Sequence, residues 1–111
     1  MTDFFYLVSN IPYQPDPPGY EQLQRPAVTL KLNYGDCDDK AILFGSFCVF
    51  RNITSGVSIV SEKPDKNFHH VFNFIIFNGN IIDMDCTYQN SQPGKRRVWA
   101  KRKNLIIYER I

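Results

Sequence analysis

Three side-chain types that together perform nucleophilic acyl transfer occur in this chain. A thiol is present at Cys37, imidazoles at His69 and His70, and carboxylates at Asp83 and Asp85. In that chemistry the thiol attacks a carbonyl, the imidazole accepts and later returns the proton, and the carboxylate orients the imidazole. The groups lie far apart in sequence, so the question is whether the fold brings them together.

Cys37 is predicted to begin a buried helix that runs to about residue 50. Apolar residues dominate this stretch, and it contains no proline. Asp36 is a suitable N-cap, and Asp39 follows three residues later, in the position of a capping-box acid. One helical face is formed by Cys37, Ala41, Phe44 and Cys48. A helix N-terminus favours a thiolate, so the position suits a reactive cysteine.

The acids around Cys37 need not oppose a thiolate. On a helix, Asp38 and Asp39 are rotated by roughly 100° and 200° from the face of Cys37. Negative side chains also stabilise the first turn of a helix. We therefore expect these aspartates mainly to hold the helix terminus.

Asn78-Gly79 predicts a β-hairpin, because two β-rich runs flank this dipeptide. A two-residue loop fixes the pairing of the strands. His70 and Asp85 then become diagonal neighbours on one face of the sheet, within reach of a hydrogen bond. His69 points to the other face, and Asp83 lies two residues further along the strand. A register slip of one residue would overturn this choice.

Spacing alone does not favour the catalytic interpretation over interpretations in which the same residues have only structural roles. Cysteines on an apolar helix face are usually core residues, and Cys48 is expected to be one. His69 and His70 would then be one surface and one buried residue. Asp83 and Asp85 would cap strand ends or form part of a calcium site, although no EF-hand spacing is present.

Length and composition predict one domain spanning residues 1–111. The chain is 43% hydrophobic, with 9 Phe and 6 Tyr, which is enough for a core. The three cysteines show no CxxC spacing, which argues against a disulfide framework or zinc site and for a reducing compartment. No apolar run is long enough to span a membrane, and no secretory signal is recognised. No metal or organic cofactor is expected.

The two ends of the chain differ in character. Residues 1–30 are expected to be an extended, proline-rich lead-in. Residues 94–111 are basic, with 7 Lys/Arg against 1 Asp/Glu, whereas residues 1–93 hold 6 against 10. We interpret this C-terminal segment as a solvated strand edge, although nucleic acid binding is the alternative. One helix followed by β-rich runs indicates an α+β fold.

Three motifs together resemble the transglutaminase-like superfamily of papain-like cysteine enzymes. They are "GDCDDKAILFGSF", "HHVFNFIIFNGN" and "DMDCTY". Their order and distances match the Gly-Asp-Cys helix start, His strand and Asp-x-Thr strand of that superfamily. The run "IPYQPDPPGYEQLQRPAVTL" is similar to the lead-in of phage and prophage members.

This resemblance implies a papain-like core, in which the cysteine-bearing helix packs on a small antiparallel sheet. It implies Cys37 as nucleophile, His70 as general base and acid, and Asp85 as orienting carboxylate. The oxyanion hole would use the backbone N–H of Cys37, with Tyr34 as a candidate second donor.

The expected function is therefore that of a cysteine enzyme that opens an amide through a thioester. Hydrolysis, as in a peptidase or amidohydrolase, is favoured over crosslinking, because a transamidase must select an amine over water. The substrate would be a peptide or protein, in the cytoplasm of a bacterial host. The alternative is a non-catalytic phage or prophage morphogenesis protein that retains the fold and binds phage structural proteins. Nucleic acid and membrane are not favoured as partners.

Overall fold

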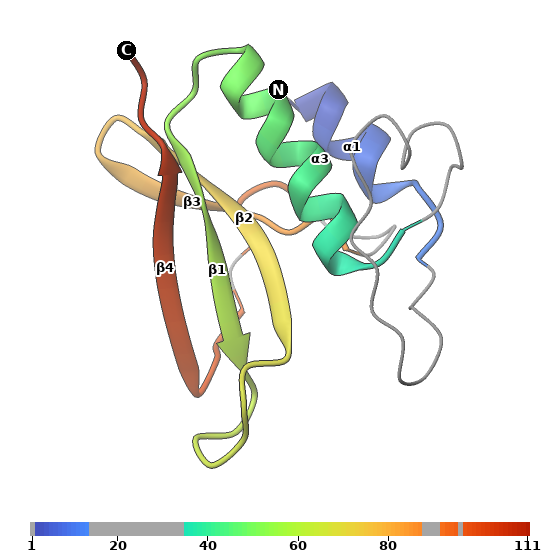
Figure 1. Cartoon of the computed structure of the whole chain (residues 1–111), viewed down its shortest axis with the longest axis vertical. Coiled ribbons are helices and arrows are strands. Elements are labelled where there is room, and N and C mark those ends of the chain that lie inside the picture. The colour runs from blue at the N-terminus through green and yellow to red at the C-terminus, as the bar shows by residue number, and fades with distance from the viewer. Residues whose placement is uncertain (1, 14–34, 88–91, 96) are drawn as a thin grey trace.

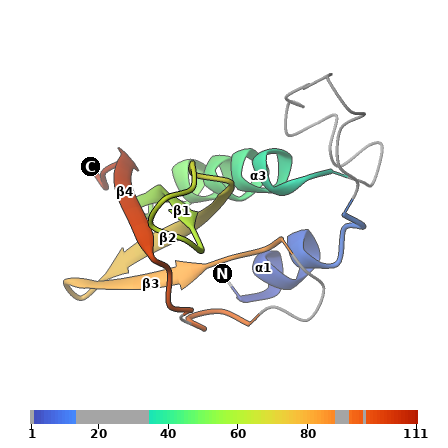
Figure 2. The same cartoon turned by 90° about the horizontal axis from the view of Figure 1, so that it is seen from below.

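The computed structural model describes residues 2–13, 35–87, 92–95 and 97–111. Within these residues it contains two helices, α1 (Thr2–Ser9) and α3 (Cys37–Phe50). It also contains four strands: β1 (Ser55–Ser61), β2 (His70–Phe77), β3 (Asn80–Met84) and β4 (Lys101–Tyr108). The two helices lie side by side, and β4 lies on the opposite side of the molecule from α1 (Figures 1 and 2).

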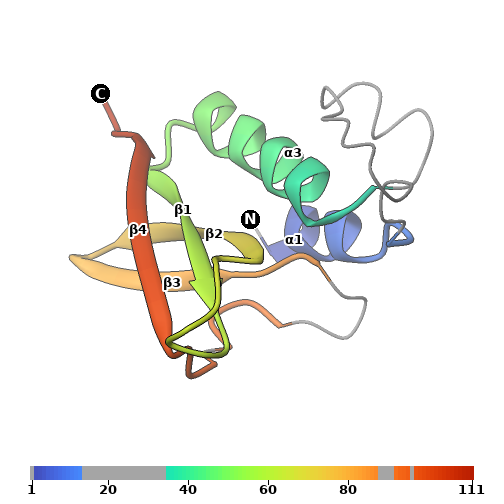
Figure 3. The ribbon, with the colours of Figure 1, turned by 60° about the horizontal axis from the view of Figure 1, so that its bottom comes forward.

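The sheet is antiparallel throughout, with strand order β3-β2-β1-β4. Helix α3 packs against β2 and β1, and α1 packs against α3. Figure 3 shows α3 passing over the sheet, with α1 beside its first turns. The predicted α+β class is confirmed at this level. No helix in the described part of the chain is long and apolar enough to cross a membrane.

Helix α3 begins where the sequence predicts, and its cap is the predicted capping box. The backbone N–H of Asp39 donates to Asp36 Oδ1 over 3.0 Å, and the N–H of Asp36 donates to Asp39 Oδ2 over 3.2 Å. These bonds satisfy N–H groups that a helix start leaves without partners. The cap fixes Cys37 as the first residue of the helix.

The hairpin register is also confirmed. Asn78 and Gly79 both have positive φ, at 53° and 79°, as a two-residue hairpin turn requires. Phe77 pairs with Asn80, and the pairing continues to Asn73 with Met84. This register carries the side chains of β2 and β3 to the faces that the sequence predicts.

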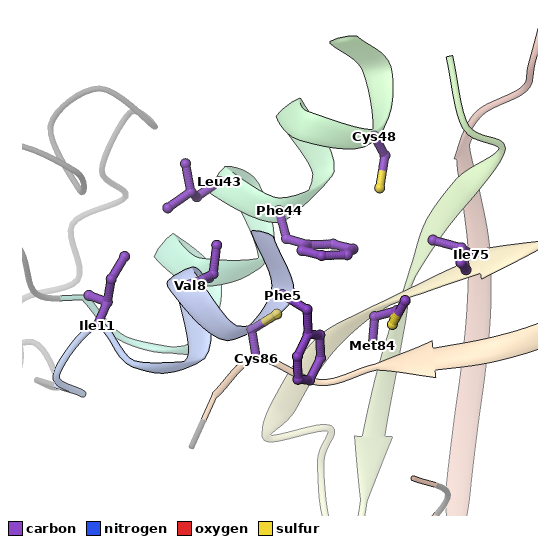
Figure 4. Close-up of a cluster of buried hydrophobic side chains, with 9 residues drawn as sticks. All are labelled: Phe5, Val8, Ile11, Leu43, Phe44, Cys48, Ile75, Met84 and Cys86. Atoms are coloured by element: carbon purple, nitrogen blue, oxygen red, sulfur yellow. The ribbon is translucent and has the colours of Figure 1, made fainter. Parts of the chain in front are cut away.

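The main core lies between the two helices and the β2–β3 hairpin (Figure 4). Its members are Phe5, Val8, Ile11, Leu43, Phe44, Cys48, Ile75, Met84 and Cys86. Cys48 is fully buried, as expected for a core cysteine. The core therefore clamps α3 to the hairpin, and these two elements hold the residues that could do chemistry.

Strand β4 is joined to the rest of the sheet by an ion pair and a close backbone approach. Arg102 Nη2 lies 2.7 Å from Asp83 Oδ1, and the Asp83 side chain is only 3% exposed. On β1, a Cβ added at Gly56 would clash with the carbonyl oxygen of Leu105. This contact occurs beside a register shift between β1 and β4, at Ser55/Gly56. Position 56 therefore has no room for a side chain, and only glycine fits there.

One expectation about local structure is wrong. Residues 1–30 were expected to be an extended lead-in, but Thr2–Ser9 form α1. This helix forms because Phe5 and Val8, three residues apart, both enter the core. The expected lead-in between residues 14 and 34 lies outside the described residues.

Candidate active site

His70 and Asp85 form the hydrogen-bonded pair that the hairpin register predicts. His70 Nε2 lies 2.9 Å from Asp85 Oδ2, and their side chains are only 9% and 16% exposed. His70 is the first residue of β2, and Asp85 directly follows β3. The two strands thus bring the imidazole and the carboxylate together at one end of the hairpin.

The Cys37 thiol lies beside the His70 imidazole, since both residues line one hollow and Cys37 contributes to raising the pKa of His70. Because Nε2 is engaged by Asp85, a proton exchanged with Cys37 would pass through Nδ1. Cys37 is half-buried, at the N-terminus of α3. The described structure thus brings together all three residues of the predicted site.

The surroundings of His70 favour its protonated form. Burial by itself lowers the pKa of His70, but the hydrogen bonds and charges of Asp85 and Cys37 outweigh it and raise the pKa to about 9. Burial by itself raises the pKa of Asp85, but the hydrogen bonds with His70 and Thr87 and the charge of His70 outweigh it and lower the pKa below its usual value. The site therefore favours an imidazolium paired with the Asp85 carboxylate.

The thiol opens into a hollow of about 240 Å³. Its lining residues are Cys37, Asp38, Ile59, Phe68, His69, His70 and Val71. Asp38 was expected to turn away from the thiol, but it forms part of this wall. Asp38 directly follows Cys37 on α3, whereas the next two residues of the first turn, Asp39 and Lys40, are buried and do not line the hollow. A substrate approaching Cys37 would pass the Asp38 carboxylate.

A chain of contacts returns from Asp85 to the helix that carries Cys37. The backbone N–H of Thr87 donates to Asp85 Oδ1 over 3.0 Å. The carbonyl oxygen of Thr87 accepts a hydrogen bond from Lys40 Nζ over 2.9 Å. Lys40 lies one turn after Cys37 on α3, so the contacts form a closed ring from Cys37 through His70, Asp85, Thr87 and Lys40.

Lys40 is a site residue that sequence reasoning missed. It is 1% exposed, and its Nζ also lies 3.5 Å from the carbonyl oxygen of Ser9 in α1. Burial lowers the pKa of Lys40, while the charge of the Asp85 carboxylate favours its protonated form. In sequence it reads as a surface lysine of the first helical turn. No local sequence pattern marks it, because its burial depends on packing against Ser9 and Thr87, which are distant in sequence.

Trp99 is a second residue near the site that sequence reasoning did not assign. Its ring centroid lies 5.7 Å from that of His70 and 6.4 Å from that of Phe72. The sequence associates this tryptophan with the basic C-terminal segment. In the structure it flanks the imidazole, and an aromatic ring beside an imidazolium favours the charged form.

The other residues that the sequence offered as candidates, His69, Asp83 and Tyr34, are not part of the His70–Asp85 pair. The side chain of His69 is exposed, and its Nε2 accepts a hydrogen bond from the backbone N–H of Glu62. Asp83 is engaged by Arg102 instead of His70. Tyr34, the candidate oxyanion donor, lies outside the described residues. Among the described residues, no group of three or more His, Cys, Asp or Glu is placed to hold a metal ion.

Comparison with known proteins gives no relative. No protein-family model, no curated protein and no solved structure matches this chain. The geometry of the site and the general chemistry of its groups therefore carry the functional argument.

Proposed function

We propose that this protein is a cysteine enzyme that cleaves an amide bond of a peptide or protein through a thioester. Cys37 is the nucleophile, His70 transfers the proton and Asp85 orients the imidazole. The observation that carries the proposal is that His70 contacts both Cys37 and Asp85, which raises its pKa to about 9. A protonated imidazole beside a cysteine stabilises the reactive thiolate.

The proposed reaction begins with the Cys37 thiolate attacking the substrate carbonyl carbon. The tetrahedral adduct carries an oxyanion, which the N-terminal N–H groups of α3, including that of Cys37, are suited to stabilise. The C–N bond then breaks, and the leaving amine takes a proton from the His70 imidazolium. The neutral imidazole next removes a proton from water, which attacks the thioester and releases a carboxylic acid.

Hydrolysis is favoured over crosslinking in this proposal. An amine would replace water in the second half-reaction of a crosslinking enzyme. Such an enzyme must exclude water, whereas the hollow above Cys37 is open and includes the polar groups of Asp38 and His69. The His70–Asp85 geometry accords with the papain-like arrangement implied by the sequence motifs. From the resemblance of those motifs alone, we propose a bacterial cytoplasmic or phage-associated setting.

The pH dependence of Cys37 alkylation tests the nucleophile. Iodoacetamide labelling is followed by intact mass from pH 5 to pH 9 in the wild type and in His70→Ala. We expect Cys37 to react at pH 6 in the wild type, and this reactivity to be lost in His70→Ala. A thiol that is inert below pH 8 would contradict the proposal.

The other two cysteines provide an internal control. Burial raises the pKa of Cys48 to about 11, despite a hydrogen bond with Ser55, and it raises the pKa of Cys86 further. Both side chains are buried, so only one label should be added below pH 8. Cys37→Ala should remain unlabelled under the same conditions.

An acylating ester then separates the two possible reactions. p-Nitrophenyl acetate should add one acetyl group to Cys37, and water should remove it. Adding a primary amine separates the products by mass, because an amide forms only if the amine resolves the thioester. Absence of any acetyl-enzyme at pH 7, with the alkylation profile intact, would show that the site does not turn over.

A non-catalytic interaction protein is the second candidate function. Strand β4 is an edge strand that exposes three consecutive apolar residues, Leu105, Ile106 and Ile107. Exposed apolar residues on a sheet edge favour strand pairing with another chain, such as a phage structural protein. In that case Cys37→Ala would leave binding unchanged, and charged residues placed on β4 would abolish it.

A further inference from the structure

A second, larger hollow adjoins the one above Cys37. It is a groove of about 580 Å³ between α3 and the strands β1, β2 and β4. Asp38 and Val71 line both hollows, so the groove continues directly from the Cys37 thiol. A ligand joined to Cys37 would therefore have the groove as its neighbouring surface.

One side of α3 forms the groove wall along almost the whole helix. The wall residues are Asp38, Ala41, Ile42, Gly45, Ser46 and Val49. They recur at intervals of three and four, and they span twelve residues, or roughly 16 Å at the rise of an α-helix. An extended peptide of about five residues has the same length.

The groove surface is mainly apolar. Val57 of β1 and Val71 of β2 line it beside α3, and Ile107 of β4 lines it on the other side. Two of the polar groups there are already engaged within the protein. Asn73 Nδ2 donates to the carbonyl oxygen of Ala41, and Ser46 Oγ donates to that of Ile42. Such a lining suits apolar side chains.

Gly45 is the only glycine within α3, and it lies in the middle of the groove wall. Glycine in a helix interior is less favourable than alanine. The backbone does not require it, because an added Cβ would meet only Asn73 Nδ2, at 3.5 Å. What the missing side chain provides is open space in the groove.

We propose that this groove binds the acyl side of the substrate as an extended peptide with apolar side chains. This inference rests on the proposed function, since it takes Cys37 as the point of attachment. It adds a substrate preference: apolar residues on the acyl side of the cleaved bond. The matching length and the apolar lining favour a peptide laid along α3.

Two peptidyl chloromethyl ketones test the preference. Acetyl-Leu-Leu-Leu-Gly and acetyl-Ser-Ser-Ser-Gly chloromethyl ketones present the same electrophile, from which the Cys37 thiolate displaces chloride to form a thioether. Burying leucine side chains should make the second-order inactivation rate at least about tenfold higher for the leucine probe. Equal rates for the two probes would overturn the proposal.

Gly45→Leu and Gly45→Ala separate filling of the groove from effects on the helix. Both replacements favour the helix, but only leucine extends into the groove. We expect Gly45→Ala to keep the preference for the leucine probe and Gly45→Leu to lose it. Iodoacetamide needs no groove, so its rate should be unchanged in both. A preference that persists in Gly45→Leu would contradict the proposal.

A second pair of variants covers the case in which Gly45→Leu does not fold. Ile107→Glu places a charge on the groove wall, at a residue 65% exposed. Ile106→Glu alters the neighbouring residue, 51% exposed and outside the groove lining. Only Ile107→Glu should reduce the rate with the leucine probe.

Other occupants would give different results. Faster inactivation by decanoyl chloromethyl ketone than by the leucine peptide would assign the groove to a lipid chain. A dimer that Ile107→Glu dissociates and Ile106→Glu does not would assign it to a second copy of this chain. Either result overturns the peptide proposal. Failure of the proposed function is distinct, since iodoacetamide labelling would then not depend on His70.

Discussion

The side chains around Cys37 depend on one another through short contacts. His70 is held by Asp85, Asp85 is held by the Thr87 N–H, and the Thr87 carbonyl is held by Lys40. Each contact constrains the next group, so the position of the imidazole depends on residues that touch no substrate. Two predictions follow from the charges and hydrogen bonds in this ring.

The pH dependence of stability should report the His70 environment. Its pKa of about 9 lies above the unfolded value of about 6.5. The resulting stabilisation is therefore fully present below pH 6.5 and is lost as pH rises through 9. It corresponds to about 3 kcal/mol in the free energy of unfolding. Urea unfolding at pH 6, 7.5 and 9 measures this loss.

Asp85→Asn tests the origin of that pH dependence. Without the carboxylate, the His70 pKa should fall, and the loss of stability between pH 6.5 and 9 should shrink. NMR titration of the imidazole in a His69→Gln background, which leaves one histidine signal, gives the pKa directly. An unchanged pKa in Asp85→Asn would show that the carboxylate does not set the charge of His70.

Lys40→Met should lower the stability of the protein and loosen the positioning of Asp85. The change keeps the length of the side chain but removes the donor to the buried Thr87 carbonyl. An unpaired buried carbonyl costs roughly 1–3 kcal/mol of stability. If Lys40 positions Asp85 through Thr87, alkylation of Cys37 should also shift to higher pH in the folded variant.

The matched control for this prediction is Lys103→Met, at an exposed lysine of β4. It should change neither stability nor the alkylation profile. If Lys40→Met is less stable but its alkylation profile is unchanged, Lys40 supports the fold and does not position the site.

At the scale of elements, two glycines have opposite roles. Gly56 in β1 has no room for a Cβ, because the Leu105 carbonyl oxygen and the Phe74 ring lie too close. Gly45 in α3 has room for one. The same substitution should therefore have opposite effects on the free energy of unfolding.

Gly56→Ala should destabilise the protein by roughly 1–3 kcal/mol, because strands β1 and β4 must separate locally. Gly45→Ala should stabilise it by about 0.5–1 kcal/mol through helix propensity. Urea midpoints of the two variants and the wild type measure both changes. A stabilising Gly56→Ala would mean that the β1–β4 contact is looser than the structure has it.

At the scale of the whole molecule, the Arg102–Asp83 pair joins the two edges of the sheet. Arg102 is on β4 and Asp83 on β3, the strands at opposite ends of the strand order. Arg102 also lies over the Phe72 ring and donates to Ser58 Oγ. The pair thus crosses both central strands.

Arg102→Ala should cost about 3–5 kcal/mol, since it leaves the buried Asp83 carboxylate without its cation. Lys103→Ala, at the exposed neighbouring residue, should be nearly neutral. Adding Asp83→Asn to Arg102→Ala should restore part of the loss. Thermal unfolding compares the wild type, the two single variants and the double variant, and a double variant no more stable than Arg102→Ala would contradict this account.

The parts of the site that the sequence predicts are those set by local chemistry. The Asp36–Asp39 cap acts over three residues, and the Asn78-Gly79 turn fixes the hairpin register that joins His70 to Asp85. Long-range packing was not predictable from such patterns. Lys40 meets Thr87 from 47 positions away, and only packing buries that lysine.

Residues 13 and 35 lie next to each other in the structure, although 21 residues separate them in sequence. Tyr13 and Gly35 form a parallel β-bridge, and the Gly35 N–H donates to the Pro12 carbonyl oxygen, two residues before Cys37. Loop closure depends only weakly on loop length, about 0.6 kcal/mol per doubling. Residues added between the two bridge positions would therefore leave the thiol where it is. The fold thus offers an insertion point two residues before Cys37, where new recognition elements can be acquired without displacing Cys37, His70 or Asp85.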